Sequence, residues 1–162
     1  MGWVFRRRAD GGMDVRLGPD VRDLLRSLPG QLETILREAP EDPSLVRLQP
    51  PAYADDEEHE AEYRRYMGDD LRQRQLASLA VLAGTAGADR LSEEEAQSWM
   101  AALNFVRLVL GTRLDVQEDD DLDEPPADED EETARFVYGY LSLLLEDLVS
   151  SLSDGLPDVV DD

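Results

Sequence analysis

The stretch that decides the fold is SEEEAQSWMAALNFVRLVLGTRL, residues 92–114. Ser92, followed three residues later by Glu95, forms the capping-box pattern, in which both side chains bond backbone N–H groups left free at a helix start. Apolar side chains then recur at steps of three or four on one face, and more apolar bulk lies off that face. The main face holds Trp99, Leu103, Val106, Leu110 and Leu114. A helix that is apolar on several sides predicts a place inside a bundle.

Other parts of the chain predict elements that surround this helix. Residues 3–17 predict a β-hairpin, because two short runs flank Ala-Asp-Gly-Gly and the glycines supply the positive φ of a tight turn. Pro29-Gly30 interrupts the first helical pattern, which predicts either two short helices or one kinked helix. The 162 residues predict one domain over 1–162, a mainly α bundle of four to five helices with this N-terminal hairpin. The predicted helices span residues 19–38, 55–83, 92–114 and 133–153.

The net charge of −22 is concentrated in three acidic segments. Residues 115–132 hold twelve carboxylates, residues 55–62 hold six and residues 154–162 hold four. The 115–132 loop and the 154–162 tail have too little apolar surface to offset the entropy of ordering, so we expect both to be mobile. A negative field repels nucleic acid and favours basic partners, so no direct binding of nucleic acid is expected.

Composition removes several classes of function. The chain has no cysteine and no lysine, which excludes disulfides, thiolate metal sites and lysine-containing phosphate loops. No serine lies in a nucleophile-elbow pattern. The first residues, MGWVFRRR, contain no apolar run of signal-peptide length, and no later apolar run is long enough to span a membrane. We therefore expect a cytoplasmic protein that is not an enzyme, with no catalytic residue, cofactor or membrane contact.

Two sequence patterns resemble parts of metal-binding motifs, but each lacks residues that its motif requires. His59 and Glu62 have the spacing of half a di-iron helix motif, but the second half of that motif is missing. Residues 119–123 have the opening rhythm of a calcium loop, but Glu124 replaces the glycine that the sharp turn requires. No metal ligand is predicted from either pattern.

Three consecutive arginines, residues 6–8, lie in the first run of the hairpin. Consecutive strand residues point to opposite faces, so the three side chains cannot form one flat patch. Two interpretations stay open: the charges guard an edge strand against aggregation, or they bind a partner.

Asn104 and Arg107 are the polar residues that the central helix must accommodate. A buried arginine without a partner costs several kcal/mol. Our hypothesis is that Arg107 pairs with a carboxylate of the 55–62 segment and so ties two helices together, the candidates being Asp55, Asp56 and Glu62. The alternative is that Arg107 reaches solvent.

Much of the chain resembles the family called domain of unknown function 2017. The resemblance rests on DPSLVRLQPPAYADDEEHEAEYRRYMGDDL (42–71), WMAALNFVRLVLGTRLDV (99–116) and FVYGYLSLLLEDLV (136–149). Family helices usually carry Asn-Asp where this chain has Asn104 and Phe105, so no role for that acid is transferred. The resemblance implies an actinobacterial protein whose relatives are often encoded near a ClpS-type protease adaptor. One branch resembles an actinomycete oxidative-stress regulator that acts with a stress sigma factor and uses cysteines, which this chain lacks.

The resulting hypothesis is a regulatory protein that acts by binding another protein, in stress-linked transcription or in the control of proteolysis. A sigma factor or a basic protein is the expected partner. An acidic nucleic-acid mimic that occupies a basic groove of its partner is the alternative, and a metal-binding protein or an enzyme is a third. The sequence leaves the oligomeric state open.

Overall fold

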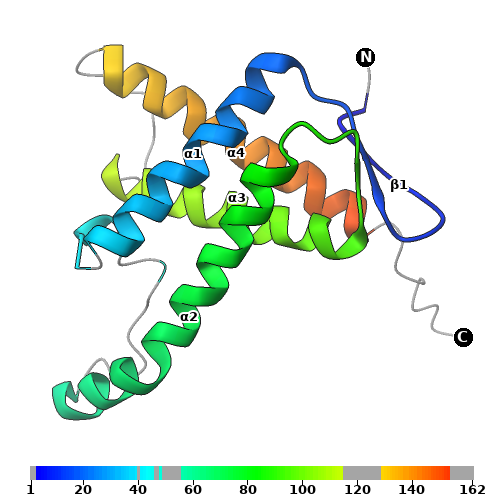
Figure 1. Ribbon diagram of the computed structural model, residues 1–162. Coiled ribbons are helices and arrows are strands. Elements are labelled where there is room, and N and C mark those ends of the chain that lie inside the picture. Colours follow the sequence, from blue (N-terminus) through cyan, green and yellow to red (C-terminus); the bar gives the residue numbers. More distant parts are fainter. Residues whose placement is uncertain (1–2, 40, 46–47, 49–55, 115–128, 154–162) are drawn as a thin grey trace, which may run out of the picture.

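The computed structural model describes residues 3–39, 41–45, 48, 56–114 and 129–153. Within these residues the chain forms four α-helices, a short 3-10 helix and a three-stranded antiparallel sheet, so the mainly α class with an N-terminal hairpin is confirmed (Figure 1). In chain order the elements are β1 (Phe5–Arg7), β2 (Met13–Val15), α1 (Pro19–Glu38), the 3-10 helix η1 (Pro43–Leu45), α2 (Glu57–Thr85), β3 (Arg90–Leu91), α3 (Glu93–Arg113) and α4 (Glu129–Ser153).

Helix α3 is the centre of the fold. It contacts α1, α2, α4 and η1, as its apolar faces predict (Figure 1). The capping box at its start is formed: Ser92 Oγ accepts from the Glu95 N–H at 3.0 Å, and Glu95 Oε1 accepts from the Ser92 N–H at 2.8 Å. Trp99 is fully buried, and its ring meets that of Phe5 edge to face at 6.2 Å.

The sheet has the order β1-β2-β3, and β1 is hydrogen-bonded to the end of α4. Phe5 pairs with Val15 across the hairpin, and β3, which the sequence patterns did not predict, adds to β2 with Met13 opposite Leu91. The hairpin meets α4 through a hydrogen bond from Ser151 Oγ to the carbonyl of Phe5, at 3.3 Å.

The three arginines of the hairpin point in different directions, as the alternation of a strand predicts. Arg6 lies over the Trp3 ring, with its guanidinium carbon 4.4 Å from the ring centroid. Arg7 donates to the carbonyl of Leu152 in α4 at 2.7 Å, and Arg8 donates to the carbonyl of Leu91 in β3 at 3.3 Å. Two of the three are therefore used to hold the hairpin to its neighbours.

Helix α1 runs without interruption from Pro19 to Glu38, the predicted bounds, so of the two alternatives at Pro29-Gly30 the chain forms a single helix. Pro29 lies inside the helix and is buried. Its missing N–H removes one backbone hydrogen bond, which would ordinarily end a helix. Burial of Leu25, Leu32 and Leu36 on the same side offsets that loss.

Helix α4 begins at Glu129, four residues before the predicted start at residue 133. The acidic run 129–132, predicted as the end of a mobile loop, forms the first turn of the helix instead. Carboxylates in a first turn are stabilised by the positive end of the helix dipole, which explains the earlier start. The rest of the predicted loop, 115–128, and the predicted tail, 154–162, lie outside the described residues.

Candidate functional site

Asn104 and Arg107 form a polar pair within α3. The Arg107 guanidinium donates to Asn104 Oδ1 at 2.9 Å, and this bond joins two turns of the same helix. Arg107 Nε is buried and has no hydrogen-bond partner among the described residues. The pair is therefore a local feature of α3, and it leaves one buried donor unsatisfied.

Of the predicted partners that the structure describes, neither Asp56 nor Glu62 pairs with Arg107. Asp56 is the N-cap of α2, where it accepts from the His59 N–H at 3.2 Å and also contacts the His59 ring. These hydrogen bonds to the His59 backbone and side chain hold the pKa of Asp56 below its usual range. Glu62 is exposed, and Asp55 lies outside the described residues.

The direction of α2 explains why Asp56 and Glu62 do not pair with Arg107. Its first half extends away from the other helices toward the lower left of Figure 1, while Arg107 lies on the central helix α3. An ion pair between α3 and Asp56 or Glu62 is therefore not formed. In the described part of the chain, acidic side chains and histidine form no group of three or more that would hold a metal ion.

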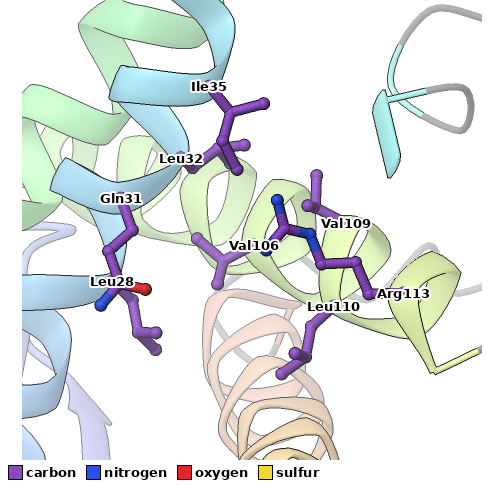
Figure 2. Close-up of a pocket in the computed structure, with 8 residues that line it drawn as sticks. All are labelled: Leu28, Gln31, Leu32, Ile35, Val106, Val109, Leu110 and Arg113. Atoms are coloured by element: carbon purple, nitrogen blue, oxygen red, sulfur yellow. The ribbon is translucent and has the colours of Figure 1, made fainter. Parts of the chain in front are cut away.

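A shallow apolar groove lies where α1 crosses α3 (Figure 2). Its volume is about 70 Å³. Pockets that bind cofactors or drug-sized ligands are usually about 300–1,000 Å³, so this groove is too small for such a molecule. Arg113 extends its side chain along the groove and covers part of the apolar lining with its aliphatic stem (Figure 2). The lining residues are Leu28, Gln31, Leu32, Ile35, Val106, Val109, Leu110 and Arg113.

The segment around η1 contacts α3 and is hydrogen-bonded to α2. Asp42 Oδ1 accepts from the Ser44 N–H at 2.8 Å and from Ser44 Oγ at 2.6 Å. These bonds, with a smaller contribution from the positive charge of Arg113, lower the pKa of Asp42 below its usual range. Gln75 of α2, which is almost fully buried, donates to the carbonyl of Leu48 at 3.2 Å. These contacts give Asp42, Ser44 and the Gln75 amide nitrogen structural roles, whereas Gln75 Oε1 is buried without a partner among the described residues.

Exposed apolar side chains gather on the outer face of α4. Phe136 is 73% exposed and Leu143 is 65% exposed. Tyr140 is half-buried beside them, its ring stacked on that of Phe136 with centroids 6.3 Å apart. Burial raises the pKa of the Tyr140 phenol. The face of α4 that packs on the body is a different one, formed by Leu141, Leu144, Leu148 and Ser151.

Gly139 lies between the two exposed apolar residues. It is three residues after Phe136 and four before Leu143, which places all three on the same side of the helix. A Cβ built on Gly139 would meet no other atom within 4 Å. A glycine inside a helix costs about 1 kcal/mol relative to alanine. Nothing in the described fold requires this glycine, because it neither turns the chain nor makes room for a neighbouring segment.

Carboxylates stand at both ends of this face. Glu132 precedes Phe136 by one turn, Asp147 follows Leu143 by one turn, and both are exposed. We call the set Glu132, Phe136, Gly139, Leu143 and Asp147 the α4 stripe. The N-terminal half of α4 extends past the other helices at the upper left of Figure 1.

The α4 stripe was missed by the reasoning from sequence, which treated this helix only as a source of buried residues. The signal was present, because Phe136 and Leu143 are seven residues apart and off the buried spacing set by Leu141, Leu144 and Leu148. Asn104 and Arg107, in contrast, were singled out and prove to bond to each other.

Comparisons with known proteins give one result. A family model described as "Domain of unknown function (DUF2017)" matches residues 3–152, which covers every element of the described fold except the last residue of α4. Searches of curated proteins and of solved structures found no match. No helix in the described part of the chain is long and apolar enough to cross a membrane.

Proposed function

We propose that this chain, which belongs to the DUF2017 family, is a non-enzymatic regulatory protein that binds another protein through the α4 stripe. The observation that supports the proposal is the exposure of Phe136 and Leu143 on a helix that already buries a separate apolar face. Large apolar side chains gathered on a surface mark sites of interaction more often than single exposed ones do. Aromatic residues in particular supply much of the binding energy of protein interfaces.

The border of the stripe indicates the charge of the partner. Glu132 and Asp147 flank the apolar residues, and the chain as a whole carries a net charge of −22. A surface of complementary potential speeds association and disfavours wrong partners. The partner we propose is therefore basic around an apolar centre.

The cellular role we propose follows the family resemblance: a cytoplasmic protein in stress-linked transcription or in the control of proteolysis. A sigma factor or another basic regulatory protein fits the chemistry of the stripe. Because the chain has no cysteine, such regulation would not depend on a disulfide within this chain.

A second candidate is an acidic mimic of nucleic acid that occupies a basic groove. Glu57, Glu58 and Glu62 are exposed at the start of α2, well apart from the α4 stripe along the chain. Binding by this route would be electrostatic and would weaken steeply with added salt. It would not depend on Phe136 or Leu143, and this difference separates the two candidates.

The test uses the full chain as bait in a lysate of the source organism. Wild type is compared with a double variant, Phe136→Gln with Leu143→Gln, and captured proteins are identified by mass spectrometry. The matched control is Val149→Gln, because Val149 is 41% exposed on another side of α4. A basic protein that wild type and Val149→Gln capture, and that the double variant loses, would support the proposal. A set of captured proteins that is the same for all three baits would contradict it.

A further inference from the structure

We infer that the α4 stripe accepts a basic amphipathic helix that crosses α4 at Gly139. The inference rests on the proposed function and adds the form of the partner. Three features of the stripe carry it: an open position at Gly139, apolar side chains on either side of it, and carboxylates at both ends.

Gly139 is the point where a second backbone comes closest. Packed helices have their axes about 8–10 Å apart, and the distance depends on the side chains at the contact. A glycine at the contact lets the other backbone approach to the lower end of this range. Phe136 and Leu143 stand on the two sides of that point and would hold apolar side chains of the crossing helix. Because the described fold gives Gly139 no contact of its own, a partner supplies the reason for its position.

The carboxylates specify a basic helix. Asp147 lies fifteen residues after Glu132, a distance along the helix of about 22 Å at 1.5 Å per residue. Arginine or lysine side chains that border the apolar face of the crossing helix would reach the two carboxylates while its centre covers Phe136 and Leu143. Both carboxylates are exposed, so they contribute mainly to the rate and specificity of association.

A second copy of this chain does not fit the stripe. If two α4 helices packed in antiparallel orientation, Glu132 of each would face Asp147 of the other. In parallel orientation each carboxylate would face its own equivalent. Either way like charges meet at both ends, and two chains with a net charge of −22 each also repel at long range. The stripe is therefore complementary to a basic helix and not to itself.

The test measures binding of a synthetic probe to the full chain by isothermal titration calorimetry at about 0.15 M salt. The probe is a peptide of Leu, Ala and Arg with one apolar face, an alanine at the centre of that face, and arginines along its borders. A scrambled peptide of the same composition is the control for charge alone. Wild type is expected to bind the amphipathic peptide at least about tenfold more tightly than the scrambled one.

The substitution Gly139→Leu distinguishes crossing at the glycine from contact elsewhere on the stripe. If the helix crosses at Gly139, the leucine side chain separates the two backbones and binding weakens by about tenfold or more. If the peptide only lies on the apolar side chains, the added leucine leaves affinity unchanged or raises it, and the inference is overturned. Circular dichroism of the variant verifies that α4 is intact.

Failure of the inference and failure of the proposed function give different results. Loss of binding in Phe136→Gln, with no loss in Gly139→Leu, retains the stripe as a binding site and removes the crossing at Gly139. Equal affinity of wild type for the amphipathic and scrambled peptides overturns the helical partner and leaves charge alone as the source of binding. No binding of either peptide overturns the inference as well, while the lysate experiment still decides the proposed function.

Discussion

Trp99 Nε1 donates a 2.6 Å hydrogen bond to Thr85 Oγ1, and this bond joins α3 to the last residue of α2. The same hydroxyl donates to the carbonyl of Val81 at 2.6 Å, so Thr85 both gives and receives a bond. Trp99 is fully buried. Trp99, the largest side chain of the core, thus has its one polar atom hydrogen-bonded where α2 ends and the chain turns toward α3.

Replacing Thr85 with valine tests this bond. Thr85→Val keeps the shape of the side chain but leaves the buried Trp99 N–H without an acceptor, which costs about 1–3 kcal/mol. We expect the free energy of unfolding, measured by urea denaturation, to fall by that amount. Thr85→Ser is the control, because it keeps the hydroxyl and is expected to lose much less. Equal losses in the two variants would show that the methyl group matters more than the bond.

Replacing Arg107 with methionine tests whether this arginine ties helices together. Among the residues that the structure describes, Arg107 makes one hydrogen bond, to Asn104 of its own helix, and its Nε is buried without a partner. Arg107→Met removes both features, and methionine is as good a helix former as arginine. We expect the free energy of unfolding to stay within about 1 kcal/mol of wild type. A loss of about 3–5 kcal/mol would indicate that a charged partner had been left unpaired.

A double-mutant cycle makes the same test directly. Arg107→Met is combined with Asp56→Asn and, separately, with Glu62→Gln. Sites that share no partner add to within about 0.3–0.5 kcal/mol. We expect coupling energies no larger than this, because Asp56 bonds to His59 and Glu62 is exposed. A larger coupling energy would restore the hypothesis of a tether between helices.

The arrangement of helices follows from patterns that act within a single segment. The capping box at Ser92 and the apolar spacing from Trp99 onward are local, so they could be read without knowing the partners of α3. Pro29 left two short helices or one kinked helix open, because its cost is local while the burial that offsets it is tertiary. The start of α4 was misread because four carboxylates signal a loop by composition but stabilise a helix by position.

The site is harder to predict because it depends on what the fold leaves uncovered. Apolar spacing identifies the face of α4 that is buried, but it does not say whether a second apolar pair, Phe136 and Leu143, finds a neighbour. Likewise, the sequence around Asn104 and Arg107 does not show whether the acidic segment 55–62 lies close enough to pair with the arginine. That depends on the path of α2, whose first half leads away from α3.

Gly12 illustrates a requirement that comes from the third strand and from the Arg8 side chain, both of which lie close to it. Gly11 has the positive φ, 90°, that a glycine turn predicts, whereas Gly12 is needed for space. A Cβ at Gly12 would lie 2.8 Å from the carbonyl oxygen of Leu91 in β3. Gly12→Ala should therefore push β3 from β2, and we expect a loss of about 1–3 kcal/mol in the free energy of unfolding. Gly30→Ala is the control, because a Cβ there meets nothing within 4 Å and alanine favours the helix.

Asp42 should make stability depend on pH in a known direction. Hydrogen bonds from Ser44 lower its pKa in the folded state below the ordinary value of 3.8. A lowered pKa gives stability that is present above pH 3.8 and is lost as pH falls through the folded-state value. Asp42→Asn removes this titration. We expect wild type to be more stable than the variant at neutral pH and the difference to shrink in acid. A difference that is constant from pH 7 to about pH 2 would refute the assignment.

The α4 stripe should contribute little to folding, and this prediction separates a binding face from part of the core. Phe136 and Leu143 are mostly exposed, and substitutions at such positions usually change stability by no more than about 0.5 kcal/mol. We expect Phe136→Gln and Leu143→Gln to unfold at nearly the wild-type urea concentration. Leu144→Ala is the matched comparison, because its side chain is buried one residue away and its loss costs about 2–5 kcal/mol. If the stripe variants lost as much as Leu144→Ala, the stripe would be stabilising the fold, and binding would no longer be needed to explain its exposure.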